Sequence, residues 1–359
     1  TPTAPPPCAA ATGYAAAQDA VVLFNDKGQT WVLKIERAGE APPPPPSAFR
    51  AEWKDLKPAG ETPRWLAPPS TAMLYDSKRK RCVLFDGAAG DARGGGKGPS
   101  EMWALDLAAT RWTCLGKRQP GDTGDKRAWP VIDFPHFRYG EAGDAYWILD
   151  NEDFWICDPA AGTWKQEGLP AGMPNWRSGN VRSGWAYDPD GRRFMRRYSG
   201  HSGSFFFYPE GRKVEKLPES PEGTEGYVDG GLAYDRKNKV FVLLPPKGGT
   251  WTFDPAAKAW REMKPAVSPP ARSMHNLLWH EKLGALVMAG GRGEGNGNWF
   301  NDLWIYETAA DRWTELKPPT AFPTGGSATA YDASQDVVVL VNDKGQTWAL
   351  KIERAGEKK

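Results

Sequence analysis

Short apolar runs separated by polar turns recur along the whole chain, and they predict β-strands. One kind of run ends in an aromatic residue followed by an acidic one, as in the Ala-Tyr-Asp sequences at 186–188 and 233–235. A second apolar run follows each such turn, for example at 82–85 and 337–341. Because these second runs are apolar without alternation, we expect them to be buried on both faces, like strands inside stacked sheets.

A second strand pair is marked by tryptophan. In four places one Trp follows another after nine residues, and the turn between them begins with Asp or Glu. An acidic side chain can accept hydrogen bonds from the turn amides, so each pair predicts a β-hairpin. The pairs are Trp103 and Trp112, Trp155 and Trp164, Trp251 and Trp260, and Trp304 and Trp313. In a degenerate fifth copy, Phe205 and Val214 stand at the two Trp positions.

The two strand pairs together form a four-stranded unit that repeats along the chain. The third-strand aromatics are Trp31, Trp103, Trp155, Phe205, Trp251, Trp304 and Trp348, at intervals of 44 to 53 residues with one of 72. Sheets at this period are typical of a β-propeller. We therefore predict an all-β fold in which residues 1–359 form a single seven-bladed propeller. A pair of β-sandwiches is the alternative, but its strands need not repeat in blocks of four.

The repeat also sets the predicted boundaries. The seven blades are expected at 10–57, 69–116, 133–169, 180–217, 228–264, 273–317 and 326–355, with Pro-rich segments at 1–9 and 41–49. Composition agrees with this architecture, since the chain has 40 Gly and 33 Pro, which disfavour helix interiors.

One unit resembles a kelch repeat, the unit also found in the central domain of galactose-oxidase-like proteins. The resemblance rests on Arg272, the pair Gly290-Gly291, the run 301–306 around Trp304, and Arg312-Trp313. The other units keep the strand and Trp pattern but lose the double glycine, so they are similar only in blade architecture. The resemblance implies a kelch-type propeller over nearly the whole chain.

The resemblance does not extend to oxidase chemistry. Galactose-oxidase-like catalysis uses a copper ion bound by two His and two Tyr, one of them linked to a Cys. Here Cys82, Cys114 and Cys157 lie inside predicted strands, and the late loops have no Tyr and His pair. We expect these thiols to be buried and inert rather than reactive.

The first and last units are near twins. Residues 14–40 align with 331–357 at a constant offset of 317. Only the first unit continues, through the polyproline stretch 42–46, to an outer strand around Trp53. We therefore expect the third strand of the last blade, 346–352, to have an open outer edge. That edge would either be shielded by its charged residues Lys351, Glu353 and Arg354 or accept a strand from another chain, which makes self-association possible.

Candidate binding residues gather on one predicted face. Fourteen of the 18 Trp serve hairpins or inner strands, and the other four fall in loops on the face where the inner strands begin. These four are Trp65, Trp129, Trp176 and Trp299. Exposed aromatic rings offer contact area to a sugar or peptide. They could instead plug the mouth of the ring or pack on neighbouring loops.

Polar residues are expected on the same face, close to the central funnel. These are His136, Arg138, Arg182, His201, Asp229, His275 and Asn276. They show no metal-ligand spacing, and the chain has no nucleophile elbow, zinc-binding His pair or phosphate-binding loop, so we expect no catalytic residue, metal or cofactor. The pre-strand Arg64 and Arg272 are expected to have structural roles.

The predicted function is therefore non-enzymatic recognition of a protein or carbohydrate partner. The alternative is a secreted enzyme or metalloprotein, of lyase, epimerase or oxidase type, with a polar site in the funnel. A formal net charge of +2 argues against a nucleic-acid partner, and no run of about 18 apolar residues predicts a membrane span. The Ala- and Pro-rich start of the sequence resembles that of a mature secreted chain, so we expect a secreted or periplasmic location.

Overall fold

A computed structural model describes most of the chain. The described residues are 11–15, 20–24, 30–34, 48–63, 71–86, 100–118, 129–130, 136–149, 153–173, 183–198, 203–224, 231–293, 297–319 and 327–356. The chain divides into two compact units, Thr1–Ser47 and Ala48–Lys359. The second unit is a β-propeller, and the first contains a separate small sheet.

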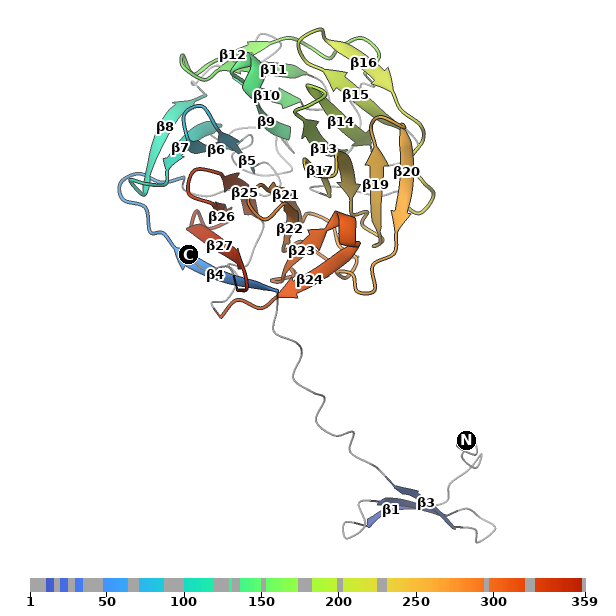
Figure 1. The fold of residues 1–359 in the computed structure, drawn as a ribbon. Coiled ribbons are helices and arrows are strands. Elements are labelled where there is room, and N and C mark those ends of the chain that lie inside the picture. Colours follow the sequence, from blue (N-terminus) through green and yellow to red (C-terminus); the bar gives the residue numbers. More distant parts are fainter. Residues whose placement is uncertain are drawn as a thin grey trace. The chain divides into compact units, whose positions relative to one another are not determined.

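Within the described residues, the propeller has six four-stranded antiparallel sheets, which we number blades 1 to 6 (Figure 1). Blade 1 contains β5 (Thr71–Asp76), β6 (Arg81–Asp86), β7 (Glu101–Asp106) and β8 (Arg111–Lys117), and blade 2 contains β9 (His136–Gly140), β10 (Ala145–Leu149), β11 (Phe154–Asp158) and β12 (Thr163–Gln166). Blade 3 contains β13 (Ser183–Asp188), β14 (Arg193–Tyr198), β15 (Ser204–Tyr208) and β16 (Lys213–Lys216), and blade 4 contains β17 (Leu232–Asp235), β18 (Val240–Leu243), β19 (Thr250–Asp254) and β20 (Ala259–Met263). Blade 5 contains β21 (Asn276–His280), β22 (Ala285–Ala289), β23 (Leu303–Glu307) and β24 (Arg312–Leu316), and blade 6 contains β25 (Ser327–Asp332), β26 (Val337–Asn342), β27 (Thr347–Arg354) and β4 (Phe49–Asp55).

Acidic residues shape the turns that the sequence predicts. In the turn between the first two strands of blade 1, Asp76 Oδ1 accepts a hydrogen bond from the Arg79 amide at 3.0 Å. In the outer hairpin of blade 2, Asp158 Oδ1 accepts one from the Ala160 amide at 2.8 Å. The outer hairpin of blade 4 repeats this contact, from the Ala256 amide to Asp254 at 2.8 Å.

The second strands are buried on both faces, as predicted. In β6, residues 82–85 are all fully buried. Val83 packs in a cluster shared with blade 2, whereas Cys82 and Leu84 pack in one shared with blade 6. The described residues form six such clusters, and each contains side chains from two neighbouring blades.

The prediction of seven blades is wrong, because residues 10–57 do not form a blade of the ring. Strands β1 (Ala11–Ala15), β2 (Ala20–Phe24) and β3 (Thr30–Lys34) form a three-stranded sheet in the first unit. Strand β4 pairs with β27 instead, from Trp348 opposite Asp55 to Arg354 opposite Phe49. The predicted first blade grouped β4 with the strands that precede it in the sequence, although the polyproline stretch separates them.

The same pairing corrects the expected open edge of the last blade. Strand β27 is covered along its length by β4 from the same chain, so blade 6 has four strands. Trp53 and Phe49 of β4 are each 3 % exposed and pack with Leu283 of blade 5 and Leu350 of blade 6. The burial of these two aromatic side chains joins the start of the propeller to its end and stabilises the closed ring.

Hydrogen bonds from outer-strand Trp residues tie neighbouring blades together. Trp112 Nε1 in blade 1 donates to Thr347 Oγ1 in blade 6 at 3.0 Å, and both side chains are buried. Trp313 Nε1 in blade 5 donates in the same way to Thr250 Oγ1 in blade 4 at 2.9 Å. The acceptor is the Thr that directly precedes the third-strand Trp in each case.

Removal of the Trp53 side chain should open the ring. We expect Trp53→Ala to lower the free energy of unfolding by about 3–5 kcal/mol, the usual cost of truncating a large buried aromatic residue. Urea unfolding followed by Trp fluorescence measures this change. Val267→Ala is the control, because Val267 is 59 % exposed and its truncation should leave the unfolding midpoint unchanged. An unchanged midpoint for Trp53→Ala would contradict closure through β4.

The bond between blades 1 and 6 can be tested without creating a cavity. Thr347→Val keeps the side-chain shape but leaves the buried Trp112 N–H without an acceptor, and it should cost about 1–3 kcal/mol of unfolding free energy. Thr347→Ser keeps the hydroxyl and should cost less than Thr347→Val. Equal losses for the two variants, measured by thermal unfolding, would show that the hydrogen bond contributes nothing.

Candidate functional site

A cavity of about 440 Å³ lies among the inner strands of the propeller. Its lining includes residues from the start of these strands, such as Thr71 and Asn276, and from their ends, such as Tyr75 and Trp279. Ligand sites in proteins commonly have volumes of about 300–1,000 Å³. The cavity is therefore large enough for a small ligand or one end of a longer one.

Six aromatic residues line the cavity near the ends of the inner strands, one from each blade. We call this set the aromatic belt: Tyr75, Tyr139, Tyr187, Tyr234, Trp279 and Tyr331. Several of its polar tips bond to acidic residues in the adjoining turns. Tyr139 OH donates to Asp144 at 3.0 Å, Tyr331 OH to Asp336 at 2.9 Å, and Trp279 Nε1 to Glu281 at 2.7 Å.

These contacts keep the belt tyrosines neutral. Burial, reinforced by the hydrogen bond to Asp144, raises the pKa of Tyr139 well above its ordinary value, and burial together with Asp336 does the same for Tyr331. Burial likewise raises the pKa of Tyr234. Tyr139 and Tyr234 are 8 % and 6 % exposed and pack in the clusters between blades. Tyr75, Tyr187, Trp279 and Tyr331 are half-buried, so these four supply the accessible ring carbon of the belt.

Turn residues, most of them polar, surround the belt at the end of the cavity. Ser77, Glu141, Arg236, Glu281 and Ala333 each directly follow the first strand of their blade, and all five line the cavity. Ser77 Oγ donates to Glu141 Oε1 at 3.1 Å, and Arg236 lies 3.7 Å from Glu281. We call the four polar ones, Ser77, Glu141, Arg236 and Glu281, the polar rim. It places two carboxylates, one guanidinium and one hydroxyl beside the aromatic wall.

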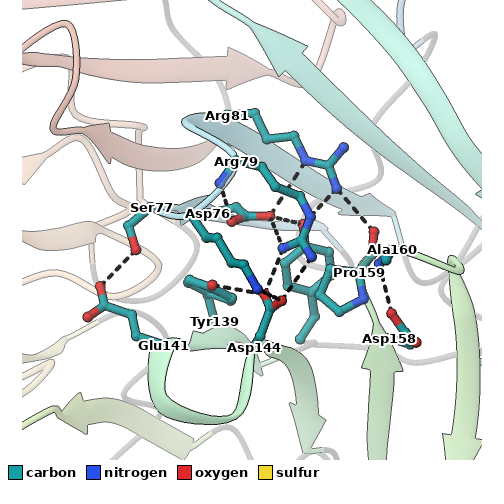
Figure 2. A network of polar contacts seen from close by, with 12 residues as sticks. Asp76, Ser77, Arg79, Arg81, Tyr139, Glu141, Asp144, Asp158, Pro159 and Ala160 are labelled. Atoms are coloured by element: carbon teal, nitrogen blue, oxygen red, sulfur yellow. Dashed lines mark hydrogen bonds and ion pairs between the residues drawn. The ribbon is translucent and has the colours of Figure 1, made fainter.

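A charged network holds blades 1 and 2 together beside this rim (Figure 2). Asp144 is a left-handed residue (φ 44°) that ends the short 3₁₀ helix Glu141–Gly143. Its carboxylate accepts hydrogen bonds from Lys78 Nζ at 2.5 Å and from Arg79 Nη1 at 2.7 Å, both from blade 1. Arg79 also donates to Asp76 at 3.1 Å. The network fixes the turn that carries Glu141.

This network makes a prediction about pH. The hydrogen bonds from Arg79 and Lys78 hold the pKa of Asp144 well below its ordinary value of 3.8. A carboxylate with a lowered pKa stabilises the fold above its unfolded-state pKa, and this stability is lost as the pH falls toward its folded-state pKa. Asp144→Asn should therefore lower the melting temperature at pH 7, and the difference from wild type should shrink below about pH 4.

The control for the pH experiment is Glu219→Gln, because Glu219 is exposed. This variant should melt at the wild-type temperature over the whole pH range. If the difference between Asp144→Asn and wild type is the same at pH 3 and pH 7, the charge on Asp144 does not stabilise the fold.

Four of the predicted site residues meet in the cavity: Arg138, His275, Asn276 and Trp299. Arg138 donates to the Phe137 carbonyl at 2.8 Å and to the Trp185 carbonyl at 3.1 Å, so it bridges blades 2 and 3. Burial lowers its pKa to about 10, which leaves it positively charged at neutral pH. Trp299 is 37 % exposed and lies 5.9 Å from the Arg292 guanidinium.

His275 is the most unusual of the four. It is only 3 % exposed, and neither ring nitrogen has a hydrogen-bond partner among the residues that the structure describes. Burial and the nearby Arg272 lower its pKa to about 3, so the ring is neutral at physiological pH. A neutral imidazole can both donate and accept a hydrogen bond.

The other predicted site residues are placed differently. Trp129 is 7 % exposed, stacks on Phe85 with ring centroids 6.5 Å apart, and donates to Ser100 Oγ at 2.9 Å. Its ring fills the core between blades 1 and 2 and offers no surface to a partner. His136 begins β9, but its side chain lies outside the described part of the chain. Trp65, Trp176, Arg182, His201 and Asp229 also lie outside the described residues.

The aromatic belt is the feature that the sequence prediction missed. The repeated aromatic before each turn is visible in the sequence, at positions such as Tyr187 and Tyr234, but it predicted only the end of a strand. In a closed ring, residues at equivalent positions of the inner strands lie around one cavity.

The described thiols and acids show no further reactive cluster. Cys82 and Cys157 are free and buried as expected, and burial raises the pKa of Cys157 to about 12. The expectation that Cys114 is buried is wrong, because it is exposed on the outer strand β8. Among the described residues, no three His, Cys, Asp or Glu side chains are grouped so that they could hold a metal ion.

No helix in the described part of the chain has the length and apolar character to cross a membrane. No family model matches the sequence.

Proposed function

We propose that this protein is a non-enzymatic recognition module that binds a carbohydrate in its central cavity. The observation that supports this function is the aromatic belt beside the polar rim. A sugar ring has an apolar face of C–H groups and an edge of hydroxyls. Aromatic side chains suit the face, and carboxylates and a guanidinium suit the hydroxyls.

The polar rim has the groups needed for such a ligand. Glu141 and Glu281 are exposed acceptors for ligand hydroxyls, and Arg236 is a donor. The network around Asp144 holds the Glu141 turn in place before a ligand arrives. Little conformational entropy would then be lost at this turn on binding.

The opposite end of the cavity extends the proposed site. Trp299 supplies a partly exposed ring there, and Asn276 and the neutral His275 supply donors and acceptors. Trp65 and Trp176 remain proposed contacts on the same face. A protein partner is the second candidate at this end, because the exposed Trp299 beside Arg292 has the composition of a protein-binding hot spot.

We also propose that the propeller is of the kelch type. The residues of the kelch-like pattern in blade 5 are in contact with one another, since Arg272 donates to the Gly290 carbonyl at 2.9 Å and to Asp302 at 2.5 Å. Gly291 has φ 109°, and a Cβ there would lie 2.8 Å from the His275 Cβ. The glycine at position 291 therefore has a steric reason, which supports a relationship to kelch repeats.

An enzyme or metalloprotein with a site in the funnel is the alternative, and His275 is the observation that favours it. Its two unpaired ring nitrogens, as far as the structure describes their surroundings, could bind a substrate or a metal. Elemental analysis of purified protein separates the two proposals. Stoichiometric copper, iron or calcium would support the alternative.

A glycan array followed by calorimetry tests the carbohydrate proposal. For the saccharide that binds best on the array, Trp279→Ala and Glu281→Gln should each raise the dissociation constant by about tenfold or more. Glu262→Gln is the control, since Glu262 is exposed on the outer strand β20. If no saccharide binds, or if both cavity variants bind as wild type, the proposal is wrong.

A further inference from the structure

The N-terminal sheet repeats the inner three strands of blade 6 in sequence. Residues 11–40 and 328–357 are identical at 24 of 30 positions, with no insertion or deletion. The six positions that differ are Gly13, Ala15, Ala17, Ala20, Phe24 and Val32 in the first copy. No other pair of units in the chain approaches this similarity.

The two copies also have the same strand pairing. Tyr14 lies opposite Val21 in the first sheet, and Tyr331 lies opposite Val338 in blade 6, which is the same pair shifted by 317 residues. Leu23 lies opposite Trp31, and Leu340 lies opposite Trp348, again at the same offset. The N-terminal sheet is therefore a second version of β25, β26 and β27, formed in the same register.

We propose that the N-terminal sheet can replace β25, β26 and β27 in blade 6 of its own chain. In this exchanged form, β4 pairs with β3 instead of β27. The ring still closes with six blades, and residues 328–357 become the separate segment.

The first copy keeps the residues through which blade 6 contacts its neighbours. In the structure, Thr347 accepts the hydrogen bond from Trp112 of blade 1, and Arg354 donates to Glu307 of blade 5 at 3.0 Å. Their counterparts at the 317-residue offset are Thr30 and Arg37. In the exchanged form, blade 6 would therefore have the same residue types at its contacts with blade 1 and with blade 5.

Strand β4 is the outer strand with which both β27 and, in the exchanged form, β3 would pair. Positions 348–354 of β27 pair with β4, and the corresponding positions 31–37 differ from them only at Val32. Because β4 begins 15 residues after β3 ends, a short length of chain connects the first copy to the strand it would pair with. Such a tether gives a high effective concentration, which favours exchange within one chain over exchange between chains.

Two of the differences explain why β25–β27 hold the ring position in the structure. Asp332 is fully buried and accepts hydrogen bonds from the Ser334 amide at 2.8 Å and the Gln335 amide at 3.2 Å, whereas the first copy has Ala15 there. Val341 is fully buried, and its counterpart is the larger Phe24. In the ring, the first copy would lack the turn cap and would place a larger side chain at one core position, so we expect it to be the weaker competitor.

Charge insertion into each copy of the full-length protein tests the exchange. Leu340 is fully buried in blade 6, and Leu340→Asp should expel β25–β27 from the ring. Leu23→Asp is the matched variant in the first copy. We expect Leu23→Asp to melt like wild type, Leu340→Asp to melt somewhat lower, and the double variant to melt at least roughly 5 °C below Leu340→Asp.

Hydrogen exchange read by mass spectrometry identifies which copy is in the ring. In Leu340→Asp, peptides from 11–34 should gain protection while peptides from 327–354 lose it. If Leu340→Asp melts like the double variant and peptides 11–34 gain no protection, the proposal is overturned. Light scattering should show that Leu340→Asp is a monomer, whereas dimers would indicate exchange between chains and contradict exchange within one chain.

A milder variant keeps the test valid if Leu340→Asp does not fold. Asp332→Ala gives blade 6 the residue found in the first copy, without placing a charge in the core. It should produce two populations in hydrogen exchange, one protected at 327–354 and the other at 11–34. A single population protected only at 327–354 would count against the exchange.

Discussion

Every blade of this propeller depends on its neighbours for a core. The six hydrophobic clusters among the described residues each lie between two blades, and together they link blade 1 to 2, 2 to 3 and so on back to blade 1. A single four-stranded sheet leaves both of its apolar faces exposed to water. The pairing of β4 with β27 is therefore the constraint on which the rest depends, because it completes the outer edge of the last interface. Trp53 contributes to the cluster between blades 5 and 6, so it stabilises two blades at once.

Ring closure also creates the candidate site. Each inner strand has one aromatic residue of the belt near its end, and only a closed ring brings the six residues around one cavity. The belt tyrosines are held by acids of the turns, as Tyr139 is by Asp144 and Tyr331 by Asp336. The same contacts therefore order the ends of the blades and orient the cavity wall. Stability and the shape of the site are coupled here through shared hydrogen bonds.

Local structure was predictable from the sequence because it depends on short-range patterns. The Trp pairs mark hairpins as predicted, with Trp112 opposite Leu105 and Trp164 opposite Cys157. The number of blades was not predictable in this way. Two nearly identical segments, 14–40 and 331–357, have the same strand pattern, and both form three consecutive antiparallel strands, the first as a separate sheet and the second within four-stranded blade 6. Which of them belongs to the ring depends on long-range contacts, such as the choice of β4 between two similar edges.

The same limit applies to the candidate site residues. Trp129 and Trp299 are both loop tryptophans in the sequence, yet one is 7 % exposed in the core and the other 37 % exposed at the cavity. Their difference arises from contacts with other blades: Phe85 and Trp164 enclose Trp129, whereas Trp299 has Arg292 beside it. The prediction for Arg138 and His275 depended only on their position at or near the start of an inner strand, and both line the cavity.

Repetition and divergence separate structural from functional positions in this fold. At the last position of the first strand, blades 1, 3, 4 and 6 have Asp76, Asp188, Asp235 and Asp332, because each turn needs the same acceptor for its amides. The next position has no such requirement, and it varies among Ser77, Glu141, Pro189, Arg236, Glu281 and Ala333. A ring that repeats the Asp in its turns but varies the residue after it has an asymmetric opening. Such asymmetry allows a symmetric scaffold to bind a ligand in one orientation.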